Sequence, residues 1–233
     1  LRRPDCPRLR PPLRRGCGDV TQVGVMLRPE VLAARPERRG HLVAYFRRFA
    51  GEHLLEALHA TGREVRVYGL GERPACGRLH FRGIEERRFV EDLATCDALI
   101  STAGNQLVGE ALHLGKPVLA LPEARNFEQY INAHFLARSG AGAWREAERA
   151  TAADVTGFLA RLDTFCSSPD AGRIHGLPAT LAVLRRHLPG TPPAAPPGRG
   201  GSWPAAPARL PRPSAGTPRP AWTTTPGPRA TRR

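Results

Sequence analysis

The sequence predicts an α/β fold in which helices cover both faces of a parallel sheet. Between His41 and about residue 165, short apolar stretches alternate with longer amphipathic segments. The short stretches are apolar at nearly every position, which is typical of strands that are buried on both faces. Regular alternation of such strands with helices favours a parallel sheet over an antiparallel one.

The expected elements follow one another in a regular order. We predict strands over 41–46, 64–69, 78–83, 97–101 and 117–122, and helices over 51–62, 86–95, 104–114, 126–140 and 151–165. Leu54, Leu55 and Leu58 share one face of the first helix. Phe127, Ile131 and Phe135 recur at the spacing of an apolar helix face, and Thr151 is a capping residue. Together these elements predict a Rossmann-like domain of about 140 residues, which is large enough to bury its own core.

The positive charge of the chain belongs to its flanks. The net charge is +14, of which residues 1–40 carry +6, residues 41–184 carry −1 and residues 185–233 carry +9. The only lysine is Lys116, and thirteen of the 24 prolines lie after residue 188. This Arg-, Pro-, Ala- and Gly-rich composition predicts disordered flanks over 1–20 and 189–233, and we do not predict nucleic-acid binding.

The cysteines and the hydropathy favour a cytoplasmic protein. The five cysteines are widely spaced and form no CxxC pair, which argues against a disulfide framework and against a zinc site. No apolar run approaches the roughly 18 residues of a membrane span. Contact with the inner face of a membrane stays open. We predict no cofactor and no metal.

The segment "STAGNQLVGEALHLGKPVLALP" (101–122) is the main functional candidate. The turn around Gly104 lies at the carboxyl end of strand 97–101, where parallel sheets bind ligands. A helix that begins on so bare a turn can bind a phosphate through its free N–H groups. Glu110 lies six residues further on, about 9 Å along the helix. An acid at that distance from a phosphate can accept hydrogen bonds from the two hydroxyls of a ribose. The spacing alone fits equally well a closely packed helix with a solvated Glu110.

Residues 101–133 resemble the nucleotide-sugar-binding signature of GT-B glycosyltransferases, close to the branch of the peptidoglycan GlcNAc-transferase MurG. The matching elements occur in the family's order: Gly104, Glu110-Ala111, Gly115-Lys116-Pro117, Pro122, Glu128-Gln129 and Asn132-Ala133. "VGVMLRPEV" (23–31) is similar to the segment that links the two domains of these enzymes.

The resemblance implies a role for each matched position. Glu110 would hold the ribose, and the turn of Thr102, Ala103, Gly104, Asn105 and Gln106 would face the diphosphate. Glu128 and Gln129 would reach the sugar, and the backbone of Arg82, Gly83 and Ile84 would read the uracil edge. No catalytic base is assigned, although Glu128 is the one acid of this region to test in that role.

The resemblance also implies the domain organisation and the reaction. Residues 21–40 would be linker-like, and residues 41–188 would form the donor-binding, C-terminal half of a GT-B fold without the N-terminal acceptor domain. We expect transfer of a hexose or N-acetylhexosamine from a UDP-sugar, with a partner chain as one source of the acceptor domain. Two alternatives stay open: a non-catalytic nucleotide-binding module that needs a partner chain, and a nucleotide-sugar epimerase or hydrolase of the same fold.

Overall fold

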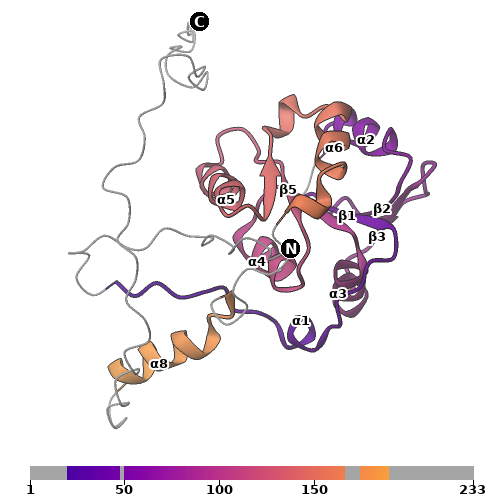
Figure 1. Ribbon diagram of the computed structural model, residues 1–233. Helices are drawn as coiled ribbons and strands as arrows, with labels where there is room; N and C mark the ends of the chain where they lie inside the picture. Colours follow the sequence, from indigo (N-terminus) through magenta and orange to yellow (C-terminus); the bar gives the residue numbers. More distant parts are fainter. Residues whose placement is uncertain (1–19, 48–49, 166–173, 189–233) are drawn as a thin grey trace, which may run out of the picture. The chain divides into compact units, whose positions relative to one another are not determined.

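The structure is a computed structural model that describes residues 20–47, 50–165 and 174–188. It contains a six-stranded parallel sheet (Figure 1). The strands are His41–Tyr45 (β1), Glu64–Tyr68 (β2), Leu79–Arg82 (β3), Ala98–Ser101 (β4), Val118–Ala120 (β5) and Gly142–Trp144 (β6). The helices are Pro29–Ala33 (α1), Glu52–His59 (α2), Glu86–Thr95 (α3), Asn105–His113 (α4), Phe127–Arg138 (α5), Ala152–Leu159 (α6) and Leu177–His187 (α8), with short 3₁₀ turns at Ala147–Arg149 (η1) and Leu162–Thr164 (η2). The expectations for 1–20 and 189–233 concern residues that lie almost entirely outside these ranges.

The strand order is β3-β2-β1-β4-β5-β6, and every neighbouring pair is parallel. The chain builds outward from β1 to β3 on one side, then returns to place β4 on the other side of β1. Val43 of β1 is therefore in register with Arg66 of β2 and with Leu99 of β4. The reversal between β1 and β4 is the switch point at which doubly wound sheets bind ligands.

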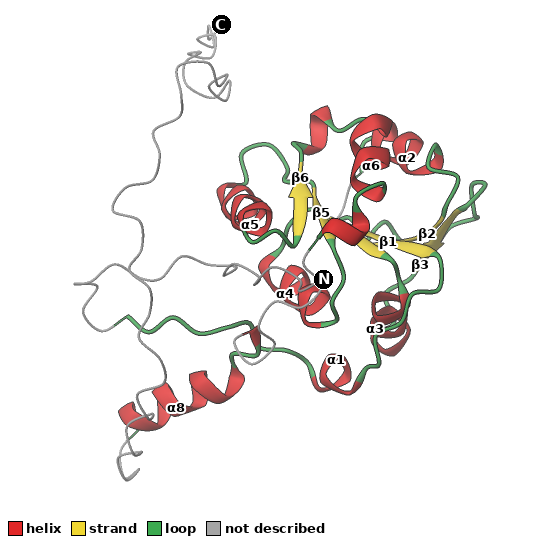
Figure 2. Ribbon diagram, viewed as in Figure 1, coloured by secondary structure: helices red, strands yellow, loops and turns green. Residues whose placement is uncertain are grey.

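Helices cover both faces of the sheet, as predicted (Figure 2). Alternate strand residues point to opposite faces, so that Val43 and Leu99 enter one core and Leu42 and Ile100 enter the other. The first core is covered by α1, α3, α4 and α5, and the second by α2 and α6. These two layers confirm the predicted α/β class.

The sequence-based boundaries hold for most elements, but the interpretation of α5 was wrong. Phe127 and Ile131 are 67% and 56% exposed, whereas the buried face of α5 consists of Gln129, Ala133 and Leu136. The apolar spacing was real, yet the helix packs through a different face. Which face of a helix becomes buried depends on the packing of the whole domain.

Four elements were not predicted, namely β6, α1, α8 and the 3₁₀ turn η1. Strand β6 is only three residues long, α1 begins with Pro29 in its first turn, and no residue of α8 is buried. Short or unburied elements give weak periodic signals. In contrast, the predicted Thr151 cap is confirmed, because its hydroxyl accepts a hydrogen bond from the backbone N–H of Asp154 and completes a capping box. None of the helices in the described ranges has the length and apolarity to cross a bilayer.

The segment before β1 packs on the same core. Val25, Leu27 and Val31 are 7% exposed or less and belong to the core beneath α4. Further along, Lys116 is buried, and its ammonium donates to the backbone carbonyls of Glu37 and Cys96. The lysine of the Gly-Lys-Pro motif therefore ties residues 35–39 to the turn before β4.

Candidate nucleotide-sugar site

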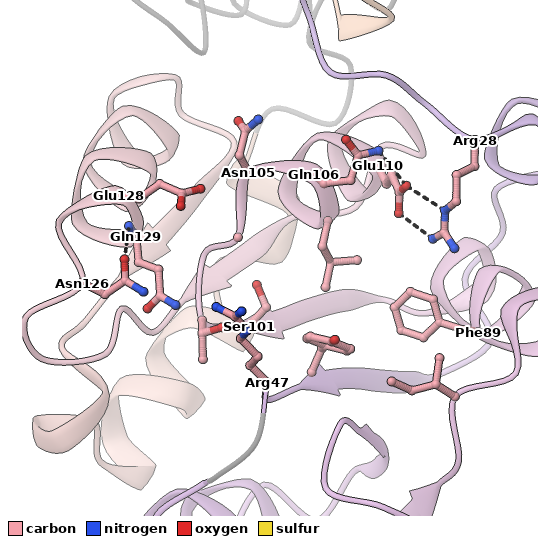
Figure 3. A pocket seen from close by; sticks show the side chains of 15 residues that line it. Arg28, Arg47, Phe89, Ser101, Asn105, Gln106, Glu110, Asn126, Glu128 and Gln129 are labelled. Atoms are coloured by element: carbon pink, nitrogen blue, oxygen red, sulfur yellow. Dashed lines mark hydrogen bonds and ion pairs between the residues drawn. The ribbon is translucent and has the colours of Figure 1, made fainter.

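One pocket lies at the carboxyl ends of β1 and β4, at the switch point of the sheet. Its volume is about 740 Å³. The lining residues are Arg28, Tyr45, Arg47, Ile84, Phe89, Ser101, Thr102, Gly104, Asn105, Gln106, Leu107, Glu110, Asn126, Glu128 and Gln129. The pocket therefore brings together all the predicted site residues except Arg82, Gly83 and Ala103. Figure 3 shows Glu128 and Gln129 on one side of it and Arg28 with Glu110 on the other.

The turn before α4 leaves the start of this helix without a side-chain cap. Gly104 is the N-cap residue, and no side chain makes a capping hydrogen bond there. Ala103 is fully buried and has a φ of +63°, an unusual value for a residue other than glycine. Its carbonyl accepts a hydrogen bond of 3.0 Å from the side-chain amide of Asn132. The Asn of the "NA" motif thus holds the turn in a conformation that opens the helix end to the pocket.

Glu110 is buried, and its carboxylate is paired with an arginine from the segment before β1. Arg28 donates to both carboxylate oxygens, from Nε to Oε1 at 2.9 Å and from Nη2 to Oε2 at 2.7 Å (Figure 3). Gln106 also donates to Oε1, at 3.0 Å. The Glu110 side chain is only 1% exposed. Its hydrogen bond to Arg28 raises the pKa of the guanidinium, which remains charged.

Sequence reasoning did not find Arg28. The segment "VGVMLRPEV" was interpreted as a linker, and no residue of it was given a role. Arg28 and Glu110 are 82 residues apart in sequence. The available signal was an acid within an apolar helix, because a carboxylate that becomes buried requires a counter-ion.

The loop after β3 reaches the pocket through Ile84. The Arg82 side chain points away into a buried polar cluster, where Asp92 accepts hydrogen bonds from Arg82, from Arg66 at 2.5 Å and from the Tyr68 hydroxyl. Burial, followed by the bond to Asp92, raises the pKa of Tyr68 to about 12. The cluster fixes the loop at its base, and Ile84 is left 63% exposed at the pocket rim. Tyr45 and Phe89 add aromatic surface to the same side, with ring centroids 5.9 Å apart.

Glu128 and Gln129 differ in how their side chains are used. The Gln129 amide accepts a hydrogen bond of 2.8 Å from the backbone N–H of Glu123 and donates to the Glu123 carboxylate at 3.3 Å. It therefore shapes the loop before α5, and it lines the pocket from a buried position. Glu128 is exposed, and Figure 3 shows it pointing toward the pocket. Glu110 and Glu128 are the only acids among the pocket residues that the structure describes.

The pocket also contains a cation at the end of β1. Arg47 is exposed, and its side chain extends into the pocket toward the end of β4 (Figure 3). From the sequence, Arg47 or Arg48 of the loop after strand 41–46 could supply positive charge to a phosphate, and of these two Arg48 lies outside the described residues. Since the charge of Arg28 is matched by Glu110, Arg47 is the cation best placed to meet an anion near the start of α4.

Several solved structures are similar to the chain over part of their length. The spinosyn forosaminyltransferase SpnP is 24% identical with a TM-score of 0.41, and the match covers 74% of this chain and 45% of SpnP. LpCGTa in complex with UDP is 22% identical with a TM-score of 0.39, covering 70% and 40%. The glycosyltransferase SnogD from Streptomyces nogalater is 20% identical with a TM-score of 0.41, covering 74% and 43%.

The present chain spans less than half the length of these three proteins. No curated protein matches it. A family model described as glycosyl transferase family 1 matches residues 16–163, which include the whole sheet and every residue of the predicted site. The chain therefore belongs to glycosyl transferase family 1.

Proposed function

We propose that this chain is the donor-binding part of a glycosyltransferase that moves a hexose or N-acetylhexosamine from a UDP-sugar. The observation that carries the proposal is the pocket at the switch point, where an uncapped helix end and a buried acid six residues later line one cavity. Each part of a nucleotide-sugar then has a surface of matching chemistry. The likeness of residues 101–133 to the MurG branch supports the choice of sugar class.

The diphosphate is assigned to the start of α4. Backbone N–H groups and the positive end of the helix dipole favour an anion at this position. Gly104 places no side chain in front of them, and Arg47 adds a full positive charge. The same groups would stabilise the charge that develops on the departing diphosphate, which is the main electrostatic task of a transferase donor site.

The ribose is assigned to Glu110, and the base to the apolar rim. Glu110 is six residues beyond Gly104, about 9 Å along the helix, which matches the step from a phosphate to the ribose. Ile84, Phe89 and Tyr45 offer apolar and aromatic surface to a planar base. The sugar is then left to the opposite side of the pocket, where Glu128, Gln129 and Asn126 provide polar groups.

The acceptor-binding part and the catalytic base are proposed to come from outside the described residues. The pocket contains one exposed acid, Glu128, and it belongs to the sugar side of the site. We therefore assign to this chain the orientation of the donor and the stabilisation of the leaving group. Deprotonation of the acceptor is assigned to a second domain, on the same polypeptide or on a partner chain.

Calorimetric titration of the full chain with UDP, UDP-GlcNAc and GDP tests the proposal. We expect binding of UDP and UDP-GlcNAc, and weaker binding of GDP because the proposal assigns recognition of a uracil to the loop after β3. Glu110→Gln should weaken UDP binding at least about tenfold, because hydrogen bonds to a charged acceptor contribute roughly 1.5–3 kcal/mol. Glu56→Gln, which changes an exposed acid of α2 remote from the pocket, is the matched control. The absence of nucleotide binding, or equal affinities for both variants, would refute the donor-site assignment.

A further inference from the structure

Residues 174–176 return to the segment before β1 and attach the base of α8 to the domain. Gly176 donates from its backbone N–H to the carbonyl of Val25 at 2.6 Å, and His175 forms a parallel bridge with Val25. Ile174 is 7% exposed and belongs to the same core as Val25. Since no residue of α8 itself is buried, these contacts hold the helix in place.

The same contacts bring two histidines together. Bridged residues point their side chains to the same side, so the ring of His175 lies on the side of Val25. Val25 packs on Gly109 of α4, where an added Cβ would lie 2.4 Å from Cγ2 of the valine. His113 is one helical turn beyond Gly109 on the same face of α4. His113 therefore lies beside the attached segment.

We propose that His113 and His175 form a pH-dependent latch, which holds residues 174–176 on the domain while both rings are neutral and releases them when the rings are protonated. This inference goes beyond the proposed function and does not depend on it. The latch would control whether α8 stays attached to the domain.

Both rings lack a partner at a nitrogen that protonation changes. Within the described ranges, Nδ1 of His113 and Nδ1 of His175 are buried and have no hydrogen-bond partner. A neutral ring can carry its one proton on Nε2 and leave Nδ1 without a proton, whereas a protonated ring has an N–H at both positions. The added N–H would be a buried donor without an acceptor, which destabilises the attached state.

No free anion on the neighbouring segments can compensate a positive charge at the pair. Across residues 24–28, α4 and residues 174–188 the only acid is Glu110, and Arg28 binds both of its oxygens. The Lys116 ammonium, just beyond α4, donates to backbone carbonyls. The remaining charged or titratable groups on these segments are Arg185, Arg186 and His187.

The direction of the pH dependence follows from these surroundings. Burial lowers the pKa of His113, and the charge of His175 lowers it further. A released ring has the ordinary histidine pKa of about 6.5. Attachment should therefore be fully stable above pH 6.5 and weaken as the pH falls below 6.5, because the released segment then binds more protons than the attached one.

The test is the protection of the Gly176 amide against hydrogen exchange, measured by NMR on the full chain and corrected for the intrinsic effect of pH. A ring that is neutral when attached and free to bind a proton when released weakens protection by about tenfold between pH 7.5 and 5.5. We expect a loss of at least about tenfold in the parent protein, a smaller loss in His113→Gln and in His175→Gln, and less than about threefold in the double variant. The control His187→Gln removes an exposed histidine of α8 and should keep the parent's loss.

Titration of the His113 ring gives a second readout that does not require release. Its C2 proton should titrate below pH 6.5 in the parent protein and closer to pH 6.5 in His175→Gln, because the second charge is then absent. The latch is overturned if Gly176 protection does not depend on pH, if the double variant keeps the parent's loss, or if His113 titrates identically with and without His175. It is also overturned if the Val43 amide of β1 has the same protection as Gly176 at each pH, because the segment would then open only by global unfolding.

Discussion

Replacing Gly109 with alanine tests whether the segment before β1 is packed on α4 as the structure shows. A Cβ atom added at Gly109 would lie 2.4 Å from Cγ2 and 2.9 Å from Cγ1 of Val25. Ordinary carbon–carbon contacts are about 3.5–4.0 Å, so either Val25 or the helix must move. Because Met26 and Arg28 are hydrogen-bonded to side chains of α4, that movement would strain both contacts.

The size of the effect follows from comparing two helix interiors. Gly157 lies in α6, and a Cβ added there meets no atom within 4 Å. Gly157→Ala should therefore stabilise the protein by about 0.8–1.0 kcal/mol through helix propensity alone. Gly109→Ala gains the same amount but adds overpacking of about 1–3 kcal/mol. The two variants should differ by about 1–3 kcal/mol in the free energy of unfolding, with Gly109→Ala the less stable.

Urea denaturation of both variants measures this difference, and a third background isolates its cause. In a Val25→Ala protein the clashing methyl groups are absent and only the Cβ atom of residue 25 remains, at 3.2 Å, so Gly109→Ala should there be clearly less destabilising than in the parent protein. The reasoning is refuted if Gly109→Ala stabilises the parent protein as much as Gly157→Ala does. That result would mean that Val25 does not pack against α4, and the account of Arg28 would lose its structural support.

Two further predictions concern buried titratable groups. Burial lowers the pKa of His41 and of His113 in the folded protein. In the unfolded chain a histidine has a pKa of about 6.5, so as the pH falls below 6.5 the unfolded chain binds more protons than the folded protein. The free energy of unfolding should therefore have its full value above pH 6.5 and decrease as the pH is lowered from 6.5. The slope should be up to about 1.4 kcal/mol per pH unit for each histidine. His41→Gln should reduce the slope of urea midpoint against pH between 6.5 and 5.5, and identical slopes would contradict the assignment. Burial also raises the pKa of the Cys96 thiol to about 12, so iodoacetamide at pH 8 should modify exposed Cys76 and leave Cys96 unmodified until denaturant is added. Peptide mapping that finds both cysteines modified at equal rates in the native protein would refute this.

Much of the site could be predicted because its residues are close together in sequence. Thr102, Gly104 and Glu110 lie on one strand–turn–helix unit, whose geometry follows from the strand end and the helical rise. Glu128 and Gln129 were expected at the site from the resemblance to GT-B transferases, and both line the pocket at the start of α5. Arg28, which a distant segment contributes, was missed, and Arg47 was named only as one of two arginines that could supply charge to a phosphate.

The amino-acid sequence by itself determined the α/β class, the order of the principal strands and helices, and the uncapped start of α4. These properties depend on periodicity and turn residues within a few positions of one another. Only the tertiary structure decided that α5 buries its face of Gln129, Ala133 and Leu136, that Asn132 supports the turn at Ala103, and that Arg28 pairs with Glu110. The two hydrogen bonds join residues that are 29 and 82 positions apart in sequence, and the buried face of α5 depends on how the whole helix lies on the sheet. A pattern within a few neighbouring residues cannot predict which distant groups meet in space.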